Sequence, residues 1–262
     1  MIQNWEALNS DRNTLAHLQE QWEAMLDDST LKEEDYHQII AQNGGLFLGN
    51  IFNCFTSISK LNLGDDFQTD FIIPRDEGSY GLSYEFIEIE SPHTLAFNKD
   101  KSPTKRLTRA IQQVTDWEYW IKQNVDTAKR LFPSKSFLLW NEPKFTYTIY
   151  ISRRKELKDL DFYRNRYEKA HNIKIRSFDQ LTDNLSRQLF SNETHLGSSE
   201  EDRLDLLTKN MLVNPYTSSY SGKQWKTISS STEFAHSHSF ALASRLFLRE
   251  RKYSPFFRSL ET

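Results

Sequence analysis

Two apolar segments of the chain carry acidic side chains: Tyr84-Glu85-Phe86-Ile87-Glu88-Ile89-Glu90-Ser91-Pro92 and, upstream of it, Thr69-Asp70-Phe71-Ile72-Ile73. Both are rich in β-branched and aromatic residues, which is typical of strands, and a loop containing glycine joins them as a hairpin or as close neighbours. A carboxylate inside a buried strand is costly unless it is paired or holds a cation. The two segments therefore predict a pair of strands that carries a divalent-metal site.

The spacing of the three carboxylates allows them to share one cation. Glu88 and Glu90 point to the same face of a strand because side chains alternate along it, and Asp70 on the neighbouring strand can join them. Carboxylates, waters and a phosphate suit Mg²⁺, which can activate water and offset charge on the phosphate. A solvated strand face without a metal fits the same pattern, so both interpretations stay open.

A long helix is expected from Pro103 to about Leu131, because proline is favoured at the first helical position and apolar residues then recur at helical spacing. Gln113 and Trp117 are four residues apart and share a face of this helix. A glutamine that faces a carboxylate cluster can orient water or contact a phosphate. The alternative is an ordinary surface glutamine beside core tryptophans.

The other segments complete a mixed α/β pattern. Helices are expected over residues 3–26, 31–42, 155–170 and from 177 or 179 onward, and strands over 46–58, 136–140, 145–152 and 173–176. This order favours one mixed α/β sheet with helices on both faces. We expect an N-terminal helix over residues 1–30, a central domain over residues 31–190 and a mostly helical C-terminal extension over residues 191–262.

The composition excludes several classes of protein. No apolar run is long enough to span a bilayer and the polar, acidic N-terminus does not resemble a targeting peptide, so a cytoplasmic protein without membrane contact is expected. The single cysteine, Cys54, excludes an intrachain disulfide and a cysteine-based zinc site. Residues 1–100 hold 18 acidic and 5 basic side chains. This asymmetry fits an acidic metal-binding part beside a basic face for nucleic acid, or simply two solvated surfaces.

Three motifs follow one another in an order that a known family shares. They are Gly64-Asp65-Asp66-Phe67-Gln68-Thr69-Asp70-Phe71, then Glu88-Ile89-Glu90-Ser91-Pro92, then Ala110-Ile111-Gln112-Gln113-Val114-Thr115-Asp116-Trp117. This order resembles the nuclease domain of Shedu anti-phage proteins, which belongs to the PD-(D/E)xK, or restriction-endonuclease-like, superfamily. Residues 33–40, 145–153 and 173–181 are similar to the family's first core helix, a later strand and the closing strand and helix. The resemblance therefore covers about residues 31–190 and implies a restriction-endonuclease-like fold there.

The resemblance implies roles for individual residues. Asp70 matches the first metal-binding aspartate, Glu88 the acidic residue of (D/E)xK, and Gln113 a glutamine on the following helix. Glu33 falls where a further acidic side chain can reach the metal. The implied catalytic residues are Asp70, Glu88, Glu90 and Gln113, and the implied ligands of Mg²⁺, or of Mn²⁺, are Asp70, Glu88, Glu90 and Glu33.

The chain departs from the family pattern at Glu90, where the family usually has lysine. A glutamate cannot stabilise an anion directly, but it can bind a second cation or accept a proton from water. Some restriction endonucleases carry E-x-E at this place, and a lysine from elsewhere, such as Lys99, Lys101 or Lys105, could also move in.

The function that this resemblance implies is a metal-dependent DNA endonuclease in prokaryotic anti-phage defence. The family forms homo-oligomers, and a partner protein of the defence system is a further expectation. The basic residues expected to meet DNA are Lys105, Arg106, Arg109, Arg153 and Arg154. Two alternatives remain: a catalytically silent DNA-binding or sensing module of the same fold, and a structural subunit of a defence complex.

Overall fold

The computed structural model describes residues 12–48, 58–76, 82–132 and 143–190. The described helices are α2 (Arg12–Asp27), α3 (Glu33–Gln42), α4 (Gly44–Phe47), α5 (Lys105–Gln123), α6 (Val125–Leu131), α8 (Arg154–Leu157), α9 (Asp161–His171) and α10 (Asp179–Phe190). The described strands are β1 (Ile58–Ser59), β2 (Asn62–Leu63), β3 (Phe67–Gln68), β4 (Phe71–Asp76), β5 (Leu82–Ile89), β6 (Lys144–Tyr150) and β7 (Lys174–Arg176). The expected strand over 136–140, Cys54 and the extension over 191–262 lie outside the described residues.

The main sheet is mixed, with the strand order β1-β4-β5-β6-β7. β4 pairs with β5 in antiparallel register, so the strand pair expected from the sequence is confirmed. β5, β6 and β7 run parallel, so their carboxyl ends lie at the same end of the sheet. The long connection from β5 to β6 passes through α5 and α6, as a parallel crossover requires.

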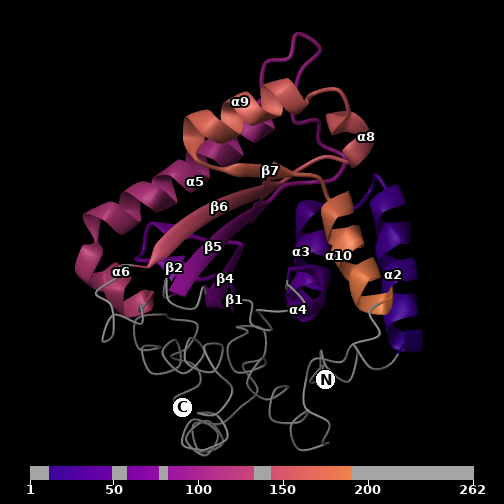
Figure 1. Ribbon diagram of the computed structural model, residues 1–262, viewed down its shortest axis with the longest axis horizontal. Coiled ribbons are helices and arrows are strands. Elements are labelled where there is room, and N and C mark those ends of the chain that lie inside the picture. The colour runs from indigo at the N-terminus through magenta and orange to yellow at the C-terminus, as the bar shows by residue number, and fades with distance from the viewer. Residues whose placement is uncertain (1–11, 49–57, 77–81, 133–142, 191–262) are drawn as a thin grey trace, which may run out of the picture.

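Helices cover both faces of this sheet, as Figure 1 shows. α5, α6 and α9 lie over one face, where Ile72 and Phe86 pack with Trp117 in one apolar core. α2, α3, α4 and α10 lie on the other side, where Phe71 and Ile87 belong to a second core. Because successive strand residues alternate between two buried faces, apolar residues stand next to one another in both strands, as in Phe71–Ile73 of β4 and Phe86-Ile87 of β5.

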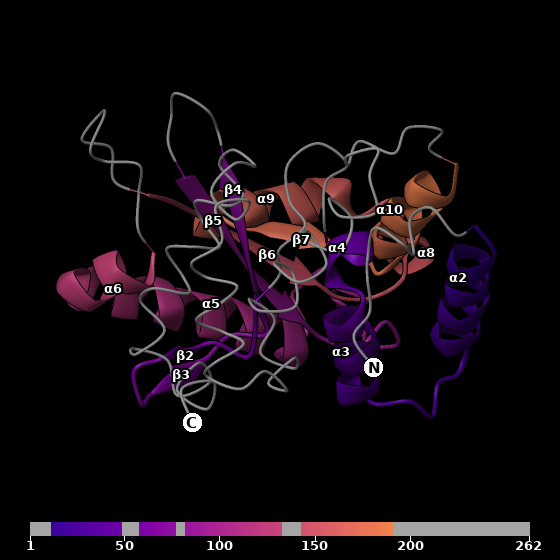
Figure 2. The ribbon, with the colours of Figure 1, turned by 90° about the horizontal axis from the view of Figure 1, so that it is seen from below.

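A small two-stranded sheet lies beside α5 (Figure 2). The turn between β2 and β3 contains Gly64, whose φ of 63° is in the left-handed region. A Cβ atom at this position would lie 3.1 Å from Nε1 of Trp120 on α5. Glycine therefore serves both the turn and the close approach to the helix.

Several element boundaries differ from the sequence-based predictions. The long helix is split at Asn124, whose side-chain amide donates to the carbonyl oxygen of Trp120, at 2.9 Å, and Thr104 rather than Pro103 caps its beginning. The helix expected over 155–170 is split into α8 and α9. The short helix α4 overlaps the beginning of the strand expected over 46–58, and among the described residues only Ile58, at the end of that range, belongs to a strand.

Candidate functional site

The register of β4 and β5 brings Asp70 and Glu88 together. Phe71 pairs with Ile87 in antiparallel register. Asp70, directly before Phe71, therefore lies opposite Glu88, directly after Ile87. Each is only 5% exposed, and the negative charge of Asp70 acts on Glu88. Oδ2 of Asp70 also accepts a hydrogen bond from the main-chain N–H of Ile89, at 2.9 Å. The Asp70 carboxylate is therefore fixed against β5.

Glu88 is held from the other side by Gln113 of α5, whose Nε2 donates to Oε2 at 3.0 Å. Burial, and then the negative charge of Asp70, raise the pKa of Glu88 well above its ordinary value. Two carboxyl groups in contact cannot both ionise at low cost without a compensating positive charge. Burial and the charge of Asp70 therefore favour the protonated form of Glu88, and a cation bound beside it would favour the charged form.

Two further carboxylates border the pair. Glu90, 4% exposed, directly follows β5, and its main-chain N–H donates to the carbonyl oxygen of Tyr150 at 2.8 Å. Burial and the charge of Glu33 raise the pKa of Glu90 to about 7, while Arg106, whose Nη1 lies 3.6 Å from Oε2, opposes the shift. Burial and the charge of Asp70 raise the pKa of Glu33 at the start of α3. All four predicted carboxylates thus influence one another.

The donor chemistry of this cluster suits a hard cation, because every donor is a carboxylate oxygen. Among the described residues, however, no group of three or more His, Cys, Asp or Glu side chains stands close enough to hold a metal ion. The structure brings Asp70 and Glu88 into direct contact, with Glu33 and Glu90 beside them rather than bonded to the same point.

Two residues that the sequence did not single out also contact Asp70. Nζ of Lys60 lies 2.7 Å from Oδ1 of Asp70, and Nε2 of the buried His37 lies 3.9 Å from the same oxygen. His37 stacks on the ring of Phe71, with the ring centroids 4.5 Å apart, and burial lowers its pKa. The available signal was a lysine two residues after Ile58 and directly before Leu61, because a lysine between buried residues needs a partner.

Basic residues of α5 lie next to the carboxylates. Arg106, Arg109 and Gln113 are spaced along one side of the helix, and Arg106 and Arg109 both act on Glu90. Arg109 and Gln113 also line a hollow of about 410 Å³ between α5 and β3. Lys105, the first residue of α5, is exposed. The arginines therefore connect the carboxylate cluster to an open surface.

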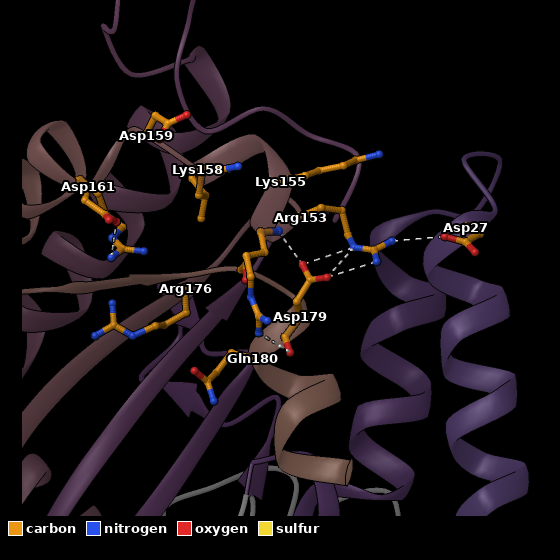
Figure 3. A pocket seen from close by; sticks show the side chains of 13 residues that line it. Asp27, Arg153, Lys155, Lys158, Asp159, Asp161, Arg176, Asp179 and Gln180 are labelled. Atoms are coloured by element: carbon orange, nitrogen blue, oxygen red, sulfur yellow. Dashed lines mark hydrogen bonds and ion pairs between the residues drawn. The ribbon is translucent and has the colours of Figure 1, made fainter. Parts of the chain in front are cut away.

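Arg153 and Arg154 lie at the carboxyl end of β6, beside a hollow of about 900 Å³ (Figure 3). Arg153 bonds Asp179 of α10 and also reaches Asp27 and the carbonyl oxygen of Leu26 in α2. Arg154 pairs with Asp183. These arginines thus tie α10 to α2 and to the end of β6, so their charges are already engaged within the protein.

Comparison with known families agrees with this geometry. A family model described as "Shedu protein SduA, C-terminal" matches residues 30–182, which is more than half of the chain. The chain belongs to the Shedu family. The matched range contains every predicted site residue of this Shedu protein, from Glu33 to Arg154, and confirms the resemblance drawn from the motif order. Membership also links the chain to anti-phage defence.

No curated protein and no solved structure matches this Shedu chain. The mixed α/β sheet with helices on both faces agrees with the fold class expected from the sequence. None of the helices in the described part of the chain is both long and apolar enough to cross a membrane.

Proposed function

We propose that this Shedu protein is a metal-dependent DNA endonuclease of restriction-endonuclease-like fold, which hydrolyses phosphodiester bonds in anti-phage defence. The observation that carries the proposal is the buried contact between Asp70 and Glu88 on adjacent strands, with Gln113 bonded to Glu88. A divalent cation, Mg²⁺ or Mn²⁺, would remove the repulsion between the two carboxylates and is the group that such a site suits.

Each residue of the cluster has a role in this proposal. Asp70 and Glu88 hold the cation, and Glu33 and Glu90 supply further oxygen donors. A bound divalent cation supplies positive charge that polarises the scissile phosphate. Gln113 orients the phosphate or the attacking water through its amide group. Glu90 can bind a further cation or accept a proton from that water.

The DNA backbone would lie along α5. Lys105, Arg106 and Arg109 offer positive charge beside the cluster, and the hollow next to Gln113 gives access from solvent. Arg153 and Arg154 were also expected to contact DNA, but their ion pairs favour a structural contribution first. A homo-oligomer in the cytoplasm, acting with a partner protein of the defence system, completes the proposal.

The test is cleavage of supercoiled, linear and single-stranded DNA with Mg²⁺ or Mn²⁺. We expect wild type to cut, and Asp70→Asn and Glu88→Gln to lose activity by about a hundredfold or more, since each removes charge from the cation site. Asp65→Asn, at an exposed turn residue, is the matched control and should cut like wild type. Isothermal titration with Mn²⁺ should show binding to wild type and weaker binding to both site variants.

Glu90 favours a second candidate function, because it stands where the family usually has lysine. In that case the protein binds DNA without cutting it and acts as a sensing module. DNA binding that weakens steeply with salt, together with no cleavage under any metal, would support this second function and contradict the first. If the protein neither binds nor cleaves DNA, a role as a structural subunit is what remains.

A further inference from the structure

Lys60 is attached to Asp70 at both its main chain and its side chain. It follows β1, and its main-chain N–H donates to the carbonyl oxygen of Asp70, at 2.9 Å. Its ammonium group donates to Oδ1 of the same residue, at 2.7 Å. The main chain of Lys60 has a φ of 54°, a left-handed conformation that is unfavourable for a residue with a Cβ atom. Such a conformation persists where surrounding contacts hold it.

The surroundings of Lys60 are those of the candidate site. Its side chain is 22% exposed, while the Asp70 side chain that it contacts is 8% exposed. The positive charge of Lys60 also acts on Glu33 and His37, both from α3. Because Asp70 in turn contacts Glu88, the ammonium group lies at the edge of the carboxylate cluster.

The lysines that the sequence offered as replacements lie elsewhere. Lys99, Lys101 and Lys105 are all exposed, and in the described part of the chain the lysine that pairs with Asp70 is Lys60. Lys60 is partly buried and contacts the first carboxylate directly. Lys60 follows β1, which pairs with β4 on the side away from β5. It therefore reaches Asp70 from a different strand than β5, which carries the family motif.

We propose that Lys60 takes the place of the lysine that the family pattern has lost at Glu90, and that its ammonium group contacts the scissile phosphate. An ammonium group has three N–H donors, so Lys60 can keep its bond to Asp70 and still donate to a phosphate oxygen. This inference rests on the proposed endonuclease function and adds a catalytic residue to it.

The role of Lys60 in the reaction is electrostatic. The water oxygen forms a bond to phosphorus, and the bond from phosphorus to one bridging oxygen breaks, with the electron pair leaving on that oxygen. The proton of the water passes to a carboxylate of the cluster, and the leaving oxygen takes a proton from solvent. Lys60 stays protonated throughout and stabilises the negative charge that develops on the phosphate.

The first variant is Lys60→Met, which keeps an unbranched side chain but removes the charge. Lys101→Met is its matched control, because Lys101 also has a left-handed main chain, with a φ of 69°, and is exposed. We expect Lys60→Met to slow Mg²⁺-dependent cleavage by about a hundredfold, as loss of one charge-stabilising donor does in other active sites, and Lys101→Met to cut like wild type. Lys60→Arg, which keeps the charge, should recover part of the rate.

Two further measurements separate this role from a purely structural one. Mn²⁺ binding by titration calorimetry should be as tight in Lys60→Met as in wild type, or tighter, because the variant keeps every carboxylate and removes a positive charge that repels the cation. Binding of uncleaved DNA in Ca²⁺ should change by less than about threefold, since many phosphate contacts share that affinity. Weaker Mn²⁺ binding or loss of folding in Lys60→Met, with Lys60→Arg failing equally, would overturn the catalytic role.

The outcomes also separate this inference from the proposed function. If Asp70→Asn is inactive while Lys60→Met cuts at the wild-type rate, the endonuclease stands and Lys60 is not part of its chemistry. If wild type cuts no DNA with any metal, the endonuclease function itself fails, and the inference fails with it. A double variant, Lys60→Met with Glu90→Lys, that regains cleavage would show directly that one lysine replaces the other.

Discussion

Nε2 of Gln113 on α5 donates a hydrogen bond to Oε2 of Glu88 on β5, at 3.0 Å, across 25 residues of chain. The bond crosses from a helix to the end of the strand that it covers, so it fixes the position of Glu88 relative to α5. Gln112, the neighbouring residue, is exposed, and its side-chain amide donates to Asp116 of the same helix. These two glutamines therefore form a natural pair for comparison.

We expect Gln113→Leu to reduce DNA cleavage by about tenfold or more and to lower the free energy of unfolding by about 1–2 kcal/mol, because a buried acceptor loses its donor. Gln112→Leu should change stability by less than about 0.5 kcal/mol and leave cleavage as it is. Urea unfolding and a cleavage time course check both. Equal cleavage rates for wild type and Gln113→Leu would show that Gln113 has no part in catalysis.

The carboxyl group of Glu90 makes stability depend on pH. Its pKa is raised to about 7 in the folded protein, by burial and by Glu33 and Asp70 against the opposing charges of Arg106 and Arg109. The folded state therefore holds a proton that the unfolded state has released, so stability is highest below the ordinary pKa and falls as pH rises through about 7. One pKa unit corresponds to about 1.4 kcal/mol, so the loss approaches about 3 kcal/mol.

The measurement is urea unfolding between pH 5 and 8.5 in the presence of a chelator, comparing wild type with Glu90→Gln. The difference between the two should grow in favour of Glu90→Gln as the pH rises. Adding Mn²⁺ should stabilise wild type more at the high end of this range, because protons no longer compete with the cation. A difference that does not vary with pH would show that Glu90 titrates at its ordinary value.

Arg75 and Glu85 form an ion pair on the opposite face of the sheet from the candidate site. Nη2 of Arg75 lies 2.6 Å from Oε2 of Glu85, and the hydroxyl group of Thr148 donates to Oε1 at 2.7 Å. Burial alone would raise the pKa of Glu85, but Arg75 and Thr148 outweigh it and hold the pKa below its ordinary value. This pair is therefore a test of stability that is separate from catalysis.

We expect Arg75→Met to cost about 2–4 kcal/mol at pH 7, since it leaves a buried charge without its partner. A carboxyl group with a lowered pKa contributes stability above its ordinary pKa and loses it as the pH falls, so the cost should shrink below about pH 4. Thermal unfolding from pH 3 to 7 measures this. The double variant Arg75→Met with Glu85→Gln should regain part of the stability, and its failure to do so would contradict the pairing.

We expect Arg109 to contact the DNA backbone, because it is exposed and lines the hollow beside Gln113. Replacing Arg109 with Gln should weaken DNA binding and reduce the slope of log affinity against log salt by about 1, as loss of one phosphate contact does. Arg166→Gln on α9, also exposed, is the control. An unchanged slope for Arg109→Gln would place the DNA on another surface.

The pattern of apolar residues predicted the elements well where burial is regular. The strand pair around Phe71 and Ile87, the apolar face of α5 and the elements β6, β7 and α10 are confirmed. Breaks inside helices were missed at Asn124 and between α8 and α9, because a side-chain bond to a main-chain carbonyl or a short turn leaves the apolar periodicity unchanged.

The candidate site was predictable only in part. Asp70, Glu88 and Gln113 come together as their spacing along two strands and a helix suggests. Their chemistry as a metal site stays a prediction. The ion pairs of Arg153 with Asp179 and Asp27 were not foreseeable, because they join residues that are far apart in the sequence.

The sequence by itself determined the alternation of carboxylates with apolar residues on β4 and β5 and, through the order of its motifs, membership of the Shedu family. Only the tertiary structure decided which positive charge accompanies those carboxylates. Lys60 reaches Asp70 because the chain turns back after β1 through a left-handed residue, and no local pattern encodes that contact. The physical reason is that strand periodicity fixes which face a side chain occupies, whereas ion pairing depends on which distant segment folds against that face.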